Sequence, residues 1–393
     1  MVGVGLVVTM GFSHAARRQE PHAAMSSSPR TVFGRISLLD VFAQVPDPRD
    51  PRGVRHPLPG ILAVASAAVT AGARTLVGIG EWVAHAGPET LASLGIGPDD
   101  RAPSESTIRR TLASLDADEL DRRLGAWASM RVGQVSGRRL VAVDGKSMRG
   151  AAVAGRRPHL LAALAHERGV VVGQRAVPDK SSEIPALKDL LEPMDLAGVV
   201  LTADALHCQR DTAAWLVARG ADYVMTVKGN QPTLRNRLKT LPWGQVPGHT
   251  AVQTGHGRRV RRTVKAVQVP DWVDWPGAGQ VLQIRRTRTV KGRKTTEVVY
   301  AICSVPMTDA PPRVVAGWIQ GHWAIENALH WVRDVVFDED RHQLRVGNGP
   351  QIMASLRNTA LSLLRLAGWT NIAAGLRHHA RDVTRPVGLL TTP

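Results

Sequence analysis

Cysteine is nearly absent from this chain, because only Cys208 and Cys303 occur among its 393 residues. Two cysteines cannot build a disulfide framework, and they cannot supply a cysteine-based zinc site. His207, His378 and His379 also lack the spacing of zinc ligands. No G-x-S-x-G sequence occurs, which argues against the exposed serine of a hydrolase. The sequence therefore points away from thiol, zinc and serine chemistry, and the two cysteines fit a reducing cytosol.

Long apolar runs are missing as well. No stretch of about 20 apolar residues occurs, so we expect no membrane span. Met1–Ala15 is apolar but lacks a basic segment, which makes a secretory signal the weaker interpretation. We expect residues 1–36 to be disordered or to include an incorrectly assigned start, with Met25 as an alternative initiator.

Acidic residues are in short supply relative to basic ones. The chain has 33 Asp and Glu against 50 Lys and Arg, which gives a formal net charge of +17. A field of this sign attracts polyanions, and nucleic acid is the commonest of them. An anionic membrane surface is an alternative, but the basic residues are dispersed instead of gathered on one amphipathic helix. With 44% hydrophobic residues, the chain can form two or three globular domains.

The segment 37–136 is predicted to form an all-helical domain. Apolar residues recur at helical spacing in Ser37–Val45, and Ile61–Gly80 is apolar enough for a buried helix pair. Pro46–Gly60 lies between them and is too rich in proline for a regular element. Its arginines either contact phosphate or lie in solvent.

The stretch 104–112 resembles a helix that enters DNA. Ser104 or Ser106 is the candidate N-cap, and Arg109 and Arg110 follow near the start of the helix. The alternative is the ordinary surface of a helix bundle.

Strands and helices alternate from residue 137 to 243. An apolar strand at Leu140–Val143 ends at Asp144, and a second at Val199–Thr202 is followed by Asp204. A hairpin, a third strand and two helices complete this part, at His159–Ala176, Asp222–Val227, Ser182–Leu191 and Cys208–Arg219. Such alternation predicts an α/β layer with sites at the carboxyl ends of parallel strands. Each aspartate therefore either binds a cation or caps the turn after its strand.

The stretch 244–305 interrupts this alternation. Its residues alternate between apolar and polar, as antiparallel strands do, at Val252–Val269, Gln280–Val290 and Thr295–Val305. Cations are dense here, at Arg258, Arg259, Arg261, Arg262, Arg285, Arg286, Arg288, Lys291, Arg293 and Lys294. We interpret the stretch as a basic β insertion that tracks phosphates, against the alternative of a solvated sheet face. We also predict that it is separate from the sheet that carries Asp144.

Gly321–Leu344 is the stretch around which we expect the site to be organised. It predicts a helix followed by a charged turn, with Glu326, His330, Arg333 and Asp334 on one helical face. A glutamate on such a helix is commonly a surface residue beside a core stripe. Because two aspartates close strands earlier in the chain, we favour the hypothesis that Glu326 belongs to a site.

Three carboxylates brought together by a fold are the minimum for holding divalent metal over a phosphate. Asp144, Asp204 and Glu326 are separated by 60 and 122 residues, so they can meet only through the fold. Two metal ions about 3.5–4 Å apart can align a hydroxyl or a water with a phosphate for in-line displacement. Such an enzyme needs cation ligands and basic surroundings, and it needs no covalent nucleophile.

Five stretches resemble, in the same order, the motifs of one known family. They are VAVDGKSMRGA, LTADALHCQRDTA, YVMTVKGNQPTL, GHGRRVRRT and GHWAIENALHWVRDVVFDEDRHQLRVGN. These are similar to the H-repeat-associated transposases of bacterial insertion sequences, which are DDE transposases with a ribonuclease H-like core. The resemblance extends from Ser37 to Arg365, and LLDVFAQVPDPRDPRGVRHPL and APSESTIRRTL resemble the family's N-terminal associated domain.

The resemblance implies that Asp144, Asp204 and Glu326 form an acidic triad that binds two Mg²⁺ or Mn²⁺ ions. It implies double-stranded DNA as the partner, both element ends and target, and a homodimer or higher oligomer on that DNA. It implies no membrane association and a cytoplasmic place at the bacterial nucleoid. The candidates for DNA contacts are Lys146, Arg149, Lys228, Asn230, Gln231, Arg258, Arg259, Arg261, Arg262, His322, Arg333, Arg109 and Arg110.

One part of the family pattern is missing. Broader relatives carry Tyr-x2-Arg-x3-Glu-x6-Lys around the third acid, and this chain has Ile319, His322 and Arg333 at the other three positions. Arg333 can still contact phosphate, and so can His322 if it is protonated. Nothing replaces the tyrosine.

We therefore predict an α/β fold: a ribonuclease H-like catalytic core with a β-strand insertion, preceded by an all-helical N-terminal domain. The expected divisions are the N-terminus at 1–36, the helical domain at 37–136, the core at 137–243 and 306–370, the basic β insertion at 244–305 and a C-terminal tail at 371–393. The expected function is DNA transposition, by metal-dependent hydrolysis at element ends and transfer of the 3′-hydroxyl to target DNA. A catalytically silent or domesticated DNA-binding protein is the alternative, and a nuclease without strand transfer is a third reading.

Overall fold

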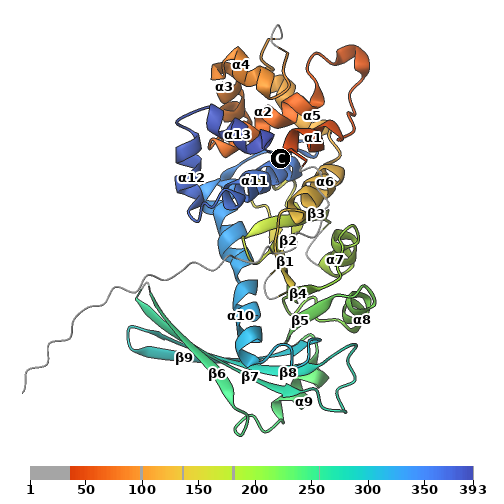
Figure 1. Cartoon of the computed structure of the whole chain (residues 1–393), viewed down its shortest axis with the longest axis vertical. Helices are drawn as coiled ribbons and strands as arrows, with labels where there is room; N and C mark the ends of the chain where they lie inside the picture. The colour runs from red at the N-terminus through yellow and green to blue at the C-terminus, as the bar shows by residue number, and fades with distance from the viewer. Residues whose placement is uncertain (1–35, 98–100, 135–136, 179–181, 256, 393) are drawn as a thin grey trace, which may run out of the picture. The chain divides into compact units, whose positions relative to one another are not determined.

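The computed structural model describes residues 36–97, 101–134, 137–178, 182–255 and 257–392. The expectations for residues 1–35, including Met25 as an initiator, lie outside the described residues. Ile36–Pro393 forms one compact unit, which Figure 1 colours from red at α1 to blue at α13. None of the helices in the described part is long and apolar enough to cross a membrane.

The region after Ile36 is helical, as predicted. Its elements are α1 (Leu38–Ala43), the short η1 (Pro51–Gly53), α2 (Leu58–Thr70), α3 (Leu76–His85), α4 (Pro88–Ser93), α5 (Glu105–Ser114) and α6 (Ala117–Ser129). Ser37 begins α1 with a capping box, because the Asp40 amide donates to its hydroxyl and its own amide donates to the Asp40 carboxylate. Nearly every residue of α2 is buried, so this helix forms the centre of the helical region.

The C-terminal segment returns to this region. It contains α11 (Gly349–Leu366), α12 (Ile372–His379) and α13 (Thr384–Thr391), and both α11 and α13 pack against α2 (Figure 1). The segment expected as a C-terminal tail, 371–393, therefore contains two helices. Leu376 and Leu390 are buried in the main core, and their burial offsets the entropy cost of ordering the end of the chain.

Strands and helices alternate after α6, as predicted. The strands are β1 (Arg139–Ser147), β2 (His159–Ala165), β3 (Val170–Val177), β4 (Val199–Ala203) and β5 (Asp222–Val227), and the helices are α7 (Glu183–Leu191), α8 (Arg210–Ala218) and α9 (Pro232–Lys239). The strand order is β3-β2-β1-β4-β5, and β2 alone runs antiparallel to the others. This order is that of a ribonuclease H-like core, so the predicted fold class is confirmed.

The sheet continues past β5, which corrects one prediction. β6 (Gly248–Gly255), β7 (Arg258–Gln268), β8 (Gln280–Val290) and β9 (Arg293–Cys303) extend it to nine strands in the order β3-β2-β1-β4-β5-β9-β8-β7-β6. The stretch 244–305 is therefore not separate from the sheet that carries Asp144. The buried end of β9, Tyr300–Cys303, pairs with Val224–Val227 of β5. The prediction failed because an alternating pattern indicates that a segment is a strand but does not indicate which strand it pairs with.

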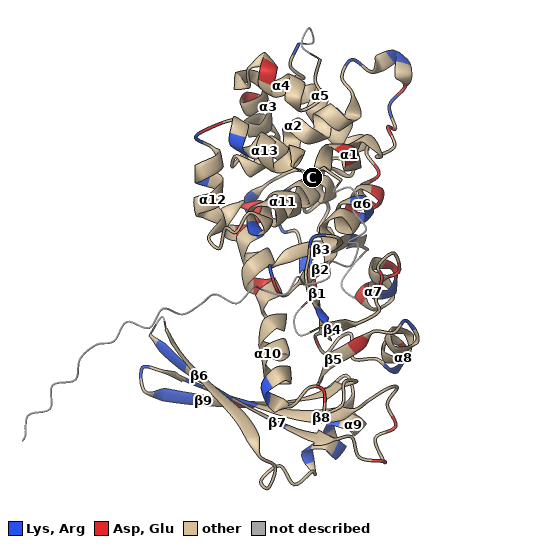
Figure 2. Cartoon of the chain, in the orientation of Figure 1, with Lys and Arg blue, Asp and Glu red and all other residues tan. Residues whose placement is uncertain are grey.

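We call residues 248–303 the basic arm. The single strand expected at Val252–Val269 is in fact the end of β6 and all of β7, which pair antiparallel. Lys and Arg side chains line the strands of the arm, whereas acids are sparse there (Figure 2). The outer part of the arm is exposed and its inner part is buried.

The helix expected within Gly321–Leu344 is present but irregular. α10 (Pro312–His322) leads into two π-helical segments, η3 (Ile325–His330) and η4 (Val332–Val336), and the charged turn contains the short η5 (Glu339–Arg341). π-helical hydrogen bonds join residues five apart, are rare, and occur frequently at functional sites. The irregularity therefore coincides with the predicted glutamate.

A buried polar seam joins α6, β3 and α11. The carboxylate of Asp121 accepts hydrogen bonds from Gln174, Gln351 and Ser355 at 2.6–3.3 Å. Its complete burial outweighs these bonds and raises its pKa from 3.8 to about 7. The folded state therefore holds a proton on Asp121 that the unfolded chain has lost.

This seam makes stability depend on pH. Between about pH 4 and 7 the folded state binds the extra proton, so the wild type is expected to lose about 2–4 kcal/mol of unfolding free energy, relative to Asp121→Asn, as the pH rises through that window. Urea unfolding of both proteins at the two ends of the window measures this difference. A difference that does not change with pH would contradict the assignment.

Candidate active site

Two aspartates lie side by side on neighbouring strands, Asp144 within β1 and Asp204 just after the end of β4. The expected end of the first strand at Asp144 is wrong, because β1 continues to Ser147 and pairs with β2 over that length. These strands are parallel, and their register pairs Val143 with Ala203. The next residue on each strand path is an aspartate, Asp144 on β1 and Asp204 just after β4. Asp204 is further fixed by the Leu206 amide, which donates to its carboxylate at 2.9 Å. The sequence-based expectation that the two residues share one edge of the sheet agrees with this register.

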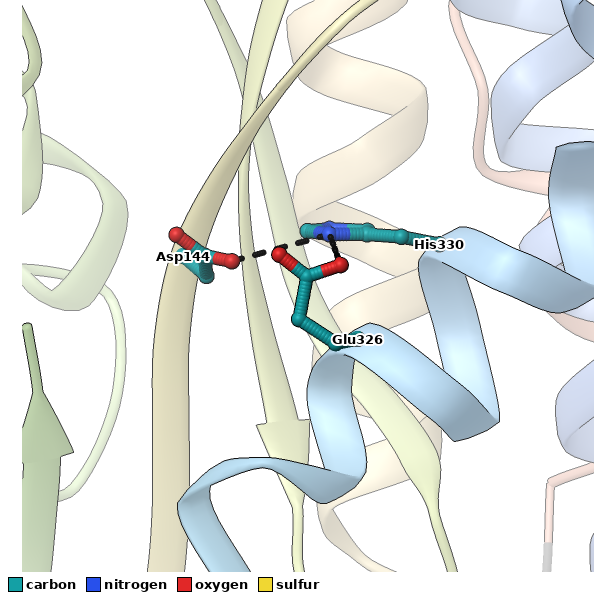
Figure 3. A group of neighbouring side chains, drawn as sticks. All are labelled: Asp144, Glu326 and His330. Atoms are coloured by element: carbon teal, nitrogen blue, oxygen red, sulfur yellow. Dashed lines mark ion pairs between the residues drawn. The ribbon is translucent and has the colours of Figure 1, made fainter. Parts of the chain in front are cut away.

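The third carboxylate reaches the same edge from η3. His330 Nδ1 lies 3.6 Å from Asp144 Oδ2 and 3.6 Å from Glu326 Oε2 (Figure 3). One ligand atom from each of the three residues lies within 4.8 Å of the others. Among the described residues this is the group of acids and histidines placed to hold a metal ion.

The three acids line one cavity of about 380 Å³. Thr202, Lys228, Arg286, His322 and Trp323 line it as well. A groove of about 540 Å³ between the basic arm and α10 shares several of these residues and adds two arginines, Arg258 and Arg262. The cavity therefore borders a basic groove, with Arg286 and Trp323 on the wall of both.

The electrostatics of the cavity favour a cation. Burial and the neighbouring Glu326 carboxylate raise the pKa of Asp144 from 3.8 to about 7, with a further contribution from Asp204. The His330 ring lowers the pKa of Glu326, and burial lowers the pKa of His330 itself, which leaves a neutral imidazole near pH 7. A divalent cation relieves repulsion between carboxylates, and oxygen donors are what Mg²⁺ and Mn²⁺ prefer. Asp144, Glu326 and His330 therefore fit such an ion, and Asp204 lies on the same cavity but outside this group.

Two expected DNA contacts lie in the interior instead. Arg333 is 0% exposed and pairs with Glu339 at 2.8 Å, and Lys146 is buried and pairs with Asp334 at 2.6 Å. Neither cation faces solvent, so neither can meet a phosphate in this structure. Burial also lowers the pKa of His322, whose Nδ1 lies 3.2 Å from the Thr202 hydroxyl, so a protonated His322 is not expected either.

The other candidates for DNA contact fall into two groups. The side-chain amides of Asn230 and Gln231 donate to the carbonyl oxygens of Ala205 and Cys208, so they hold the loop after Asp204. The remaining candidates are exposed or half-buried: Arg109, Arg110, Arg149, Lys228, Arg258, Arg259, Arg261 and Arg262.

Sequence reasoning left two residues of the site without a role, His330 in the possible metal-binding group and Arg286 on the cavity wall. His330 is four residues from Glu326, and that spacing could have suggested a shared site. Arg286 lies over the Trp323 ring at 4.6 Å and lines both the cavity and the groove, but the sequence marks it only as one of many arginines.

A ribonuclease H-like sheet with aspartates on two adjacent strands, facing a glutamate on a helix, is the arrangement of a DDE-type enzyme. The chain belongs to the family described as transposase DDE domain, whose model matches residues 135–363. A second model, described as DDE_Tnp_1-associated, matches residues 39–128. The predicted family is thereby confirmed, and the chain is a DDE transposase at the level of its family.

Named relatives agree with this assignment. The chain is 32% identical to "Putative transposase YncI" of Escherichia coli O157:H7, over 84% of this chain and 87% of that one. It is 29% identical to "H repeat-associated putative transposase YhhI" of Escherichia coli (strain K12), over 88% and 94% respectively. A piggyBac transposase from a synaptic complex with hairpin DNA aligns at a TM-score of 0.42 and 11% identity, over 91% of this chain and 80% of that one, which is too loose to carry an argument.

Proposed function

We propose that this transposase hydrolyses phosphodiester bonds at the ends of a bacterial insertion sequence and transfers the resulting 3′-hydroxyl to target DNA. The observation that carries the proposal is the shared cavity of Asp144, Asp204 and Glu326, which borders a groove lined by arginines. Phosphoryl transfer of this kind depends on positioning and charge stabilisation, and it needs no covalent nucleophile.

Asp144, Asp204 and Glu326 would hold two Mg²⁺ or Mn²⁺ ions. Bound metal would stabilise the charge that develops on the phosphate and on the attacking and leaving oxygens. The chain's own residues do the rest: the Leu206 amide orients Asp204, and neutral His330 keeps Glu326 ionised and directed toward Asp144. Lys228 and Arg286 at the cavity wall are placed to bind the phosphates that flank the scissile bond.

Double-stranded DNA is the partner in this proposal. The basic arm carries the DNA across the site, and the helical region, with Arg109 and Arg110 exposed on α5, supplies a second contact. Two or more copies act together on the DNA, in the cytoplasm at the nucleoid. The divisions 37–136, 137–243 with 306–370, and 244–305 then correspond to end recognition, chemistry and DNA tracking.

Binding to DNA is expected to weaken steeply with salt. Each phosphate neutralised by a cation releases counterions, so log K should fall against log salt with a slope of roughly −0.9 per contact. The +17 charge and the arginines of the arm predict a slope of several units. Fluorescence anisotropy with a labelled duplex across a salt series measures the slope, and a flat titration would mean that the charge does not track DNA.

A gel assay separates this function from its alternatives. DNA that carries the element ends is incubated with a plasmid target and Mg²⁺. Joined products support the transposase, cleavage without joining supports a nuclease, and specific binding without either supports a silent DNA-binding protein.

A further inference from the structure

A buried cluster of charged side chains lies beside the cavity. None of its members is a proposed metal ligand. Its centre is Glu339, which is 2% exposed. The Glu339 carboxylate pairs with Arg333 at 2.8 Å, with Arg357 at 3.0 Å and with Lys146 Nζ at 3.8 Å. The attraction of two arginines outweighs the effect of burial and lowers the pKa of Glu339 to about 2, so it is an anion at all ordinary pH. One carboxylate therefore joins three cations in the interior.

The three cations come from three different elements. Lys146 lies on β1 two residues after Asp144, so both side chains lie on the same face of the strand. Arg333 lies on η4, in the helical segment that follows Glu326. Arg357 lies on α11 and donates a further hydrogen bond to the carbonyl oxygen of Arg74 in the helical region. The cluster thus ties the strand of one acid to the helix of another.

The turn that carries Glu339 is closely fitted to β1. Asp338 adopts a left-handed conformation at φ 57°, which reverses the chain after η4. A Cβ added at Gly150, in the loop after β1, would lie 2.5 Å from the His342 carbonyl oxygen and 2.8 Å from that of Asp340. Only glycine allows this approach. Lys146 also pairs with Asp334 at 2.6 Å and with Asp340 at 3.4 Å, so it bridges both sides of the turn.

The helix of Glu326 needs such a restraint. η3 and η4 are π-helical, and a return of either segment to a regular α-helix would shift the register by one residue, or roughly 100° about the helix axis. A shift of that size would move Glu326 relative to Arg333 and separate it from Asp144. The ion pairs on Arg333 and Lys146 hold the present register.

We infer that Lys146 and Glu339 are positioning residues that set the separation between Asp144 and Glu326, and hence the geometry of the metal site. They act through the ligands and touch neither metal nor DNA. This inference rests on the proposed function, because it assumes that these acids bind divalent metal.

Substitution of Lys146 tests the inference, because the loss of positioning and the loss of positive charge should change the affinity for a divalent ion in opposite directions. Removal of a cation beside acidic ligands should by charge alone strengthen binding of a divalent ion. Loss of positioning should weaken it, by about 10–100-fold as for other supporting residues of metal sites. Mn²⁺ binding to full-length Lys146→Met, without DNA, is measured from the paramagnetic resonance signal of the free ion. Weaker binding than wild type supports the inference, and unchanged or tighter binding overturns it.

Three further variants complete the experiment. Lys146→Arg keeps the cation and should bind Mn²⁺ nearly as wild type does. The double variant Lys146→Met/Asp334→Asn removes the nearest acid together with the lysine, and Glu339 and Asp340 keep their arginine partners. It serves if the single variant does not fold, and the inference predicts the same loss. Lys188→Met, a matched control that removes a half-buried lysine on α7 outside the cluster and the cavity, should bind as wild type does, and a loss there would overturn the specific role of the cluster.

Failure of the proposed function would look different. Wild type that binds Mn²⁺ no better than Asp144→Asn would contradict the metal site itself, and the inference would fall with it. Mn²⁺ binding that is lost in Asp144→Asn and retained in Lys146→Met would contradict only the positioning role.

Discussion

Asp144→Ala, Asp204→Ala and Glu326→Ala are each expected to lower DNA cleavage and joining by about a thousandfold or more, while DNA binding survives. Each substitution removes a proposed metal ligand, and with it the charge stabilisation on which phosphoryl transfer depends; loss of one such stabilising group typically costs about 10²–10³-fold, and loss of a bound ion costs more. The measurement is the rate of strand transfer with Mg²⁺ in excess, beside anisotropy with the same duplex.

Stability separates this effect from misfolding. Burial and repulsion from Glu326 raise the pKa of Asp144, so Asp144→Ala should leave the free energy of unfolding level or higher. Asp195→Ala removes an exposed carboxylate outside the cavity and should transfer strands at the wild-type rate. Strand transfer retained by any one of the three variants would remove that residue from the proposed triad.

The second large effect is expected on the basic arm. Replacing Arg258, Arg259, Arg261 and Arg262 by Gln is expected to weaken DNA binding by about a hundredfold at low salt, and to reduce the salt slope by roughly 3–4 units, if all four meet phosphate. These arginines lie along β7, and two of them line the groove that leads to the cavity. Anisotropy titrations of both proteins across a salt series measure the affinity and the slope together.

A matched variant controls for net charge. Arg168, Arg219, Arg377 and Arg381 are exposed or half-buried and lie outside the arm, so changing these four to Gln removes the same total charge. This control should keep most of the affinity and most of the slope. Exposed substitutions usually change stability by only about 0.5 kcal/mol, so both variants should melt near wild type. Equal losses in the two variants would show that total charge, and not a track on the arm, governs binding.

The sequence was sufficient to predict the residues of the candidate site, but not the residues that hold them in position. Asp144 and Asp204 could be singled out because each follows a run of buried strand residues in an α/β layer, although β1 continues past Asp144 to Ser147. Glu326 followed from helical spacing and from the family motif. The π-helical segments could not be predicted, because their residues satisfy an ordinary helical pattern until tertiary contacts widen the turns.

Lys146 and Arg333 show why charge in a sequence is ambiguous. A lysine or arginine close to a catalytic acid looks the same in the sequence whether its side chain contacts DNA or a buried carboxylate. The outcome here depends on Glu339 and Arg357, which lie far from Lys146 in the sequence and meet it only in the fold. The pairing of β9 with β5 could not be predicted for the same reason. It depends on which buried strand of the folded sheet has no neighbour on one side.

The most direct test of the account is a strand-transfer assay with wild-type protein under changed metal. A duplex that carries the element end and a supercoiled target plasmid are incubated with Mg²⁺, with Mn²⁺, or with a chelator, and the products are resolved on a gel. The account predicts joined products with either metal and none with the chelator, while the duplex stays bound throughout. Joined or nicked DNA that forms equally well in the chelator would contradict a metal-dependent site at Asp144, Asp204 and Glu326.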